Sequence, residues 1–358
     1  MLAEILIALP WLVKTTLIER DTASCPHGSS SPSASSSSPK STLPSCSCTR
    51  PRLLDHNTLS IVECELVSPD QLLSIEGATH LVALPSPAHV RARGTIIGGC
   101  DSDLVWAVDY RGNAMVVKGG PGITRSEADM AAYVDSRTAV PVPQVYGAVQ
   151  ESDSTFLYFE RIVGEPLDQA WPRIARAGYA SVCEQLRELL DELHSLEAPP
   201  GTIAGSLDGS NTFAFTFRQR NKEPRAFGNL TSTAEIVNHA RQRYLAMPGN
   251  TVDRWAALES RVDRSAPLVA VHGDLHPGNI LVSVHDARVV RIVGLVDWEN
   301  GGFYPEWVER FAIVNRVVNS SSRHLYPLLR TVFGLSEPFP ATKADYEWVR
   351  VLCKAVRM

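Results

Sequence analysis

The sequence predicts an α+β fold in which a β-rich N-terminal part is followed by a mainly helical C-terminal part. Two observations lead to this prediction. Residues 95–163 hold short apolar segments separated by turn residues, with a single helix-like stretch among them. After residue 164, leucines recur at helical spacing and few strand-like segments remain. The length of 358 residues leaves room for two such parts.

Composition excludes several classes of protein. The chain has 34 Lys and Arg against 39 Asp and Glu, a formal charge of −5, so no general basic field is available to hold nucleic acid. No apolar segment reaches the ~18 residues that span a bilayer, which argues against a membrane protein. The seven cysteines are odd in number and scattered. They favour reduced thiols in a cytoplasmic protein over disulfides or structural zinc.

The N-terminal residues 1–51 are expected to form a leader outside the folded part. Met1–Val13 is apolar, but it carries an acidic residue where a secretory signal would have a basic one. A short helix or a loose leader is therefore favoured over a signal peptide. Ser24–Ser47 contains 12 serines and 4 prolines, a composition that predicts disorder.

Residues 52–163 are expected to form the first folded lobe, with its clearest signals from Thr95 onwards. Leu104–Val108 and Ala114–Lys118 are apolar strand-like segments that flank a turn at Arg111–Asn113, which predicts a hairpin. Thr124 and Glu127 have the spacing of a capping box, so a helix is expected from Glu127 to about Ser136. Phe156–Glu160 is a further strand candidate.

Residues 164–358 are expected to form a second, mainly helical lobe. Leucines between Val182 and Leu196 follow helical spacing, with charges on the opposite face. Further helices are expected at 233–246, 251–262, 304–319 and 344–357. Strands are expected at Leu268–Val271, Ile280–Val284 and Val289–Val296.

A cluster of polar residues follows two of these expected strands. The first strand leads into His272-Gly273-Asp274, and Asn279 follows Asp274 by five residues. The last strand ends at Asp297. Carboxylate and amide oxygens are the ligands that Mg²⁺ prefers, and phosphoryl transfer needs such oxygens beside a catalytic acid–base group. This pattern therefore favours magnesium-dependent phosphoryl transfer.

The motif H-G-D-x-x-x-x-N followed by D-x-E resembles the aminoglycoside phosphotransferase and choline kinase-like family, and most closely its fungal phosphotransferase-like members. The resemblance extends over roughly residues 95–320. It implies a two-lobed protein-kinase-like fold, with a small antiparallel β-sheet N-lobe and a mainly helical C-lobe. It also implies an enzyme that uses ATP and Mg²⁺ to transfer the γ-phosphate to a hydroxyl group of a small molecule.

The same resemblance implies roles for individual residues. Asp274 corresponds to the catalytic base, and Asn279 and Asp297 correspond to the Mg²⁺ ligands. Lys118 corresponds to the strand lysine that contacts the ATP phosphates, and Glu127 to the helix acid that pairs with it. The capping-box spacing leaves a second interpretation of Glu127 open.

Further positions carry weaker signals. The resemblance implies that backbone groups from Glu160 to Ile162 form the hinge that binds adenine. Gly98 and Gly99 begin the candidate phosphate loop, although the G-x-G-x-x-G pattern is missing. Glu299 is either close to the metal or simply solvated. The histidine of the motif is expected to be structural, and to hold its loop by a hydrogen bond to the backbone or to the aspartate of the D-x-E motif.

Two alternatives remain open at this stage. The degenerate glycine loop is compatible with an inactive kinase-like binding protein. The string His272-x-Asp274-x-His276 is superficially similar to the ligand string of a metal-dependent hydrolase. The sequence identifies neither the acceptor substrate nor the oligomeric state. The acidic candidates for the acceptor site are Asp208, Glu235 and Glu306.

Overall fold

The computed structural model describes residues 66–67, 71–78, 83–100, 102–207, 230–246, 248–260, 262–309, 312–313 and 332. Several expectations from the sequence lie outside these residues. They are the N-terminal leader with its serine-rich segment, the acidic candidate Asp208 and the helix at 344–357.

A six-stranded sheet forms the N-terminal part, with strand order β1-β5-β6-β4-β3-β2 and antiparallel pairing throughout. Its strands are β1 (Leu72–Leu73), β2 (Thr95–Cys100), β3 (Asp103–Tyr110), β4 (Asn113–Gly120), β5 (Val145–Glu151) and β6 (Ser154–Glu160). The predicted hairpin is β3–β4. Arg111 and Gly112 form its turn with φ angles of 49° and 83°. Both angles are positive, as a tight hairpin turn requires, so this prediction is confirmed.

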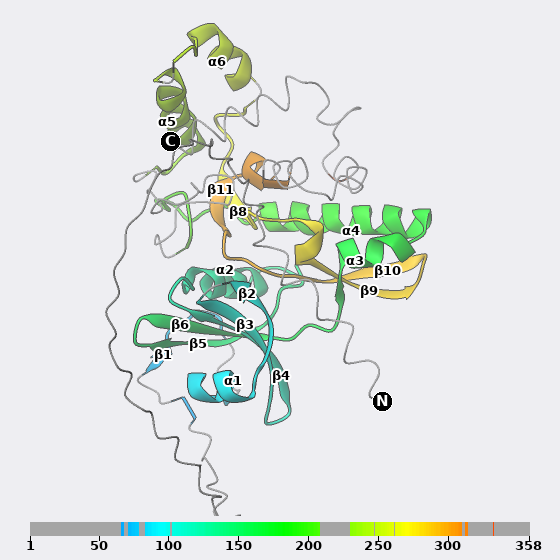
Figure 1. Ribbon diagram of the computed structural model, residues 1–358. Coiled ribbons are helices and arrows are strands. Elements are labelled where there is room, and N and C mark those ends of the chain that lie inside the picture. The colour runs from blue at the N-terminus through cyan, green and yellow to red at the C-terminus, as the bar shows by residue number, and fades with distance from the viewer. Residues whose placement is uncertain are drawn as a thin grey trace, which may run out of the picture.

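One helix covers each face of this sheet (Figure 1). Helix α1 (Pro87–Arg93) packs with the cluster around Trp106, Met115 and Tyr158 on the face turned away from the rest of the molecule. Helix α2 (Ser126–Asp135) lies on the opposite face, between the sheet and the C-terminal part.

The capping box predicted at the start of α2 is wrong. The helix begins after Arg125, and no side chain caps its N-terminus. The hydroxyl of Thr124 instead lies 2.7 Å from that of Ser126. The carboxylate of Glu127 does not turn back to the backbone because it pairs with a lysine of β4, as described below.

The C-terminal part combines helices with two small antiparallel sheets. One sheet has the order β10-β9-β7, and the other pairs β11 with β8. The strands are β7 (Glu165–Pro166), β8 (Leu268–Val271), β9 (Ile280–Asp286), β10 (Val289–Leu295) and β11 (Gly302–Pro305). The helices are α3 (Leu167–Ala170), η3 (Trp171–Arg173), α4 (Arg176–His194), α5 (Thr233–Leu245), α6 (Val252–Glu259) and η5 (Pro277–Asn279).

The helix predicted at 304–319 begins later than expected. Tyr304 and Pro305 belong to β11, where they pair with Val269 and Leu268 of β8, and the described helical residues begin at Trp307. The backbone N–H and C=O groups of β8 need hydrogen-bond partners, and strand β11, directly before the helix, supplies them.

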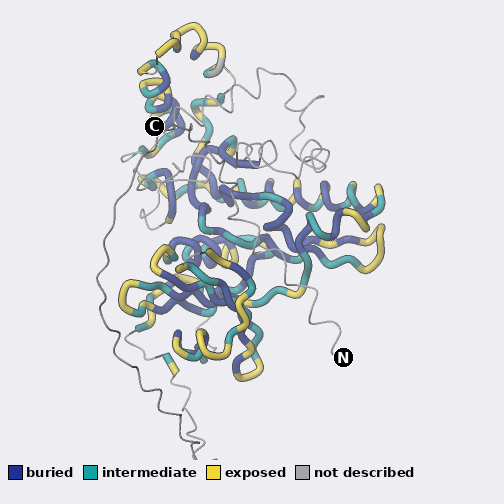
Figure 2. The backbone as a smooth tube through the Cα atoms, in the orientation of Figure 1, coloured by how far each residue is buried: buried dark blue, intermediate teal, exposed yellow. Residues whose placement is uncertain are grey.

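One hydrophobic core joins the two parts of the molecule. It includes Leu157 of β6, Met130 of α2, Leu186 of α4 and Leu295 of β10. Tyr133 of α2 also meets Phe303 of β11 edge to face, with ring centroids 5.5 Å apart. In Figure 2 the buried residues accordingly continue from the sheet through α2 into the C-terminal part.

The α+β class is confirmed, with an antiparallel sheet first and helices with smaller sheets after it. The lobe boundary at residues 163–164 stays a prediction. Among the described residues, no helix has the length and apolar character needed to cross a membrane.

Candidate active site

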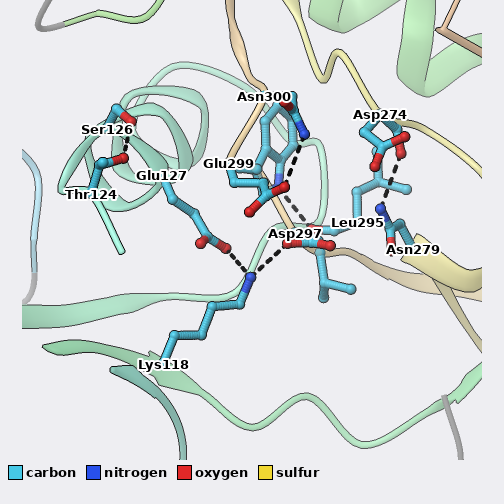
Figure 3. A network of polar contacts seen from close by, with 12 residues as sticks. Lys118, Thr124, Ser126, Glu127, Asp274, Asn279, Leu295, Asp297, Glu299 and Asn300 are labelled. Carbon is cyan, nitrogen blue, oxygen red and sulfur yellow. Dashed lines mark hydrogen bonds and ion pairs between the residues drawn. The ribbon is translucent and has the colours of Figure 1, made fainter. Parts of the chain in front are cut away.

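Lys118 lies at the centre of a buried ion-pair cluster. Its Nζ is 2.6 Å from Oε1 of Glu127 and 2.6 Å from Oδ1 of Asp297 (Figure 3). The three side chains come from β4, from the first turn of α2 and from the residues after β10. Only 12% of the Lys118 side chain and 6% of the Glu127 side chain are exposed. The structure therefore contains the lysine–glutamate pair that the family resemblance implied.

Burial and charge act against each other in this cluster. Burial by itself lowers the pKa of Lys118, but the charges of Asp297, Glu127 and Glu299 outweigh it and hold the pKa above its ordinary value. Burial raises the pKa of Glu127 to about 7, although the lysine opposes this shift. Burial also disfavours ionised Asp297, but the charge and hydrogen bond of Lys118 bring its pKa below the ordinary value. The lysine is thus a fixed cation among carboxylates.

Asp297 has a strained backbone, with φ at 72°. A left-handed backbone at a non-glycine residue costs about 1–3 kcal/mol and persists only where its surroundings enforce it. Two hydrogen bonds hold the segment before it: Val296 N–H donates to the carbonyl of Asn279 at 3.0 Å, and Leu295 N–H donates to that of Pro141 at 2.7 Å. Strain of this kind is typical of residues whose side chain must point in one functional direction.

Asp274 and Asn279 lie in the loop between β8 and β9. Asp274 is 1% exposed. Nδ2 of Asn279 donates a hydrogen bond of 3.0 Å to the backbone carbonyl of Asp274. Figure 3 places Asp297 between Lys118 on one side and these two residues on the other. The structure therefore brings together the four residues that the sequence singled out for base, metal and phosphate roles.

His272 has the structural role predicted for it. Its Nε2 lies 2.9 Å from the carbonyl oxygen of Val296, so Nε2 carries the proton, and Nδ1 accepts from the N–H of Asp274 at 3.4 Å. Burial lowers the pKa of His272 to about 4, which keeps the ring neutral near pH 7. The ring thus ties the loop of Asp274 to the segment that carries Asp297.

Glu309 supports the same loop and was missed by the sequence analysis. It is 0% exposed, and its Oε2 accepts from the N–H groups of His272 at 2.5 Å and Gly273 at 3.3 Å. Burial raises the pKa of Glu309 to about 7, although the backbone donors oppose the shift. The sequence contains a signal for a buried acid here, because Glu309 shares the apolar face of an expected helix with Val308, Ala312 and Ile313.

The donor atoms fit Mg²⁺. Asn279 and Asp297 offer an amide and a carboxylate oxygen, and the Nδ2 contact of Asn279 fixes which end of its amide is the donor for a metal. A zinc site made of the histidine string does not fit. Both ring nitrogens of His272 have backbone partners, and Nδ1 of His276 accepts from the N–H of Gly278 at 3.0 Å. Among the described residues, no group of three or more His, Cys, Asp or Glu is arranged to hold a metal.

The two glycines of the candidate phosphate loop lie in strand β2 rather than in a loop. Gly98 pairs with Val105, which pairs in turn with Lys118, so glycine and lysine lie in one row across the sheet. Gly99 has φ at 106°, and a Cβ there would lie 2.2 Å from the carbonyl oxygen of Asp103. Gly99 is therefore required by the tight β2–β3 connection itself. Its contact with a nucleotide stays a prediction.

The expected hinge follows β6. The N–H groups of Glu160 and Arg161 are already used, since they donate to the carbonyls of Gln144 at 2.8 Å and Ala114 at 3.1 Å. No hydrogen bond among the described residues uses the N–H of Ile162. Ile162 therefore offers the donor of this segment that a ligand can take, and adenine binding here stays a prediction.

The remaining acidic candidates differ in location. Glu299 contributes to the charge around Lys118 and accepts from Nδ2 of Asn300 at 3.2 Å. Glu235 accepts from Thr231 at the start of α5. Glu306 is 62% exposed and lies 4.0 Å from Nδ1 of His194. Only Glu299 lies in the charged cluster described above.

A comparison with protein families agrees with the motif. The model of the phosphotransferase enzyme family matches residues 95–329. Among solved structures, the chain is similar to a thermostable mutant of aminoglycoside phosphotransferase APH(4)-Ia in its apo form, with 14% identity, a TM-score of 0.45 and coverage of 73% of this chain and 84% of that one. A ternary complex of such a mutant with ADP and hygromycin B has 14% identity, a TM-score of 0.44 and coverage of 74% and 93%. No curated protein matches the chain.

Proposed function

The chain belongs to the phosphotransferase enzyme family, and from this premise we propose that it transfers the γ-phosphate of ATP, with Mg²⁺, to a hydroxyl group of a small molecule. The observation that carries the proposal is the cluster of Lys118, Glu127 and Asp297 beside Asp274 and Asn279. A buried lysine among carboxylates next to amide and carboxylate oxygens is the arrangement that phosphoryl transfer uses.

Each residue of the cluster has a proposed task. Asp274 accepts the proton of the acceptor hydroxyl as that oxygen attacks. Lys118, held by Glu127, stabilises the negative charge of the nucleotide phosphates. Asn279 and Asp297 would hold Mg²⁺, which supplies further charge stabilisation when bound. The backbone of the Glu160–Ile162 segment positions the adenine.

Neutral His272 and ionised Asp297 fit this assignment. Nδ1 of His272 already accepts a hydrogen bond from the N–H of Asp274, and the low pKa of the ring, about 4, makes it a weak base. His272 therefore does not compete with Asp274 for the role of base. Asp297 has a lowered pKa, so it is a carboxylate near pH 7, as a metal ligand must be.

Thermal unfolding with and without Mg²⁺ and ATP tests the nucleotide assignment. Ligand at about 100 times its dissociation constant stabilises a protein by about 2.7 kcal/mol, which raises the melting temperature by a few degrees. Lys118→Met should remove this shift. Arg111→Met is the matched control, because it deletes an exposed cation at the neighbouring turn and should leave the shift unchanged.

Catalysis is tested separately with Asp274→Asn. This variant should keep the thermal shift with Mg²⁺ and ATP but lose phosphate transfer when hydroxylated small molecules are screened for ATP consumption. The second candidate, an inactive kinase-like binding protein, is favoured by the missing glycine-rich motif alone. A wild-type protein that binds ATP but consumes none with any acceptor would support that candidate instead.

A further inference from the structure

Asp103 connects two turns at the end of the six-stranded sheet where Lys118 lies. It is the first residue of β3, directly after the β2–β3 turn. Its Oδ1 accepts a hydrogen bond of 2.8 Å from the N–H of Gly122. Gly122 belongs to the turn between β4 and α2, four residues after Lys118. The contact therefore joins the candidate phosphate turn to the segment that follows the site lysine.

Glycines make this contact possible. A Cβ on Gly120 would lie 2.2 Å from Oδ1 of Asp103, and a Cβ on Gly122 would lie 2.2 Å from Oδ2. Gly120 also has φ at 154°. The backbone from Gly120 to Gly122 approaches the carboxylate so closely that no side chain fits at either glycine. The half-buried carboxylate thus lies against the end of β4 and the turn that follows it.

The ends of β2 and β3 are paired beside this contact. Cys100 of β2 pairs with Asp103 of β3, and Gly99 pairs with Leu104. Paired strand ends that a side chain holds in place present their backbone groups in a defined position. This lowers the conformational entropy that ligand binding must remove.

We propose that Asp103 is a positioning residue for the nucleotide phosphates, and that its bond to Gly122 replaces the missing glycine-rich motif by fixing the paired ends of β2 and β3 beside Lys118. This inference rests on the proposed function. The carboxylate does not contact the phosphates itself, because like charges at contact distance repel. It acts through the two turns that it joins.

The test compares the dissociation constants of ATP with Mg²⁺ and of adenosine, measured by titration calorimetry. Asp103→Ala should weaken ATP by about tenfold, because without the bond to Gly122 the binding of the phosphates must itself order the ends of β2 and β3. Adenosine has no phosphates, so its dissociation constant should stay unchanged. Asp103→Asn keeps an acceptor oxygen and should bind ATP within about threefold of the wild type.

Asp153→Ala is the matched control, because Asp153 is an exposed aspartate at another turn of the same sheet, and among the described residues its Oδ1 accepts a hydrogen bond from its neighbour Ser154 alone, at 3.3 Å. It should change neither dissociation constant. Equal weakening of ATP and adenosine in Asp103→Ala, or no weakening of ATP, overturns the inference while the proposed function stands. A wild-type protein that binds neither ligand overturns both. If Asp103→Ala does not fold, an Asp103→Asn variant with weakened adenosine binding contradicts the inference as well.

Discussion

Glu309 is a residue whose role follows from a tertiary contact and not from its neighbours in the sequence. Its carboxylate accepts backbone N–H groups of the loop that carries Asp274, although the two segments lie more than thirty positions apart in the chain. Among the described residues, no strand pairs with the N–H groups of His272 and Gly273, because the pairing of β8 with β11 ends at Val271, so a buried acceptor from elsewhere is needed. The same burial raises the pKa of Glu309 to about 7.

A pH-dependent stability difference should follow from this shift. Between about pH 4.5 and 7 the folded protein retains a proton on Glu309 that the unfolded chain has lost. The stability that Glu309 contributes is therefore full below about pH 4.5 and is lost as the pH rises towards 7. Glu309→Gln cannot titrate. Its free energy of unfolding should thus rise relative to the wild type across this window, by up to about 3 kcal/mol.

Urea unfolding of both proteins over this pH range measures the difference. Glu235→Gln provides a control of opposite sign, because hydrogen bonds from Thr231 outweigh its slight desolvation and lower the pKa of exposed Glu235. The wild type should lose stability relative to that variant only as the pH falls below about 4.5, so the urea series of this control extends below that value, and between pH 4.5 and 7 the difference should stay nearly constant. A difference between wild type and Glu309→Gln that stays constant with pH contradicts the account of Glu309.

Among the elements, strand β10 shows how the backbone groups at the edge of a small sheet obtain hydrogen-bond partners. It is an outer strand of the sheet β10-β9-β7, so some of its backbone groups face away from β9. Gln185 of helix α4 takes the place of a neighbouring strand. Its Nε2 donates to the carbonyl of Val290 at 2.9 Å, and its Oε1 accepts from the N–H of Ile292 at 2.9 Å. Figure 1 places α4 alongside β9 and β10.

Gln185→Met should lower the free energy of unfolding by about 2–3 kcal/mol. Methionine keeps the length of the side chain but leaves one backbone donor and one acceptor of β10 without their partner. Glu188→Met on the exposed face of the same helix is the control, and it should change stability by less than about 0.5 kcal/mol. Equal effects of the two substitutions in chemical denaturation would rule out a special role for Gln185.

At the scale of the whole molecule, the two parts share one core and one charged cluster. Met130 of α2 packs close to Gly301 of the C-terminal part, since a Cβ on Gly301 would lie 2.9 Å from Cγ of Met130. Lys118 of the sheet pairs with Asp297 of the C-terminal part. The site therefore exists only when both parts are folded and packed together.

Unfolding of the two parts should consequently be one cooperative transition. Met130→Ala should destabilise the protein by about 2–5 kcal/mol through a cavity at the centre of the shared core. The far-ultraviolet circular dichroism and the tryptophan fluorescence should shift together in that variant. Two separate transitions, with only one of them moved by the substitution, would contradict the shared core.

The sequence by itself determined the elements and the motif that depend on neighbouring residues. The β3–β4 hairpin was predictable because Arg111–Asn113 can adopt the positive φ angles of its turn. The motif from His272 to Asn279 was recognisable because its spacing is fixed within one loop, and the pairing of Lys118 with Glu127 followed from the family resemblance.

Tertiary structure alone decided features that join distant segments. It placed Tyr304 and Pro305 in β11, drew the Glu127 carboxylate away from a capping box, and set Asp297 2.6 Å from Lys118. It also brought Glu309 into contact with the loop that carries Asp274, and Asp103 into contact with Gly122. Buried backbone groups and charges take partners wherever packing supplies them, and a pattern of neighbouring residues does not contain that information.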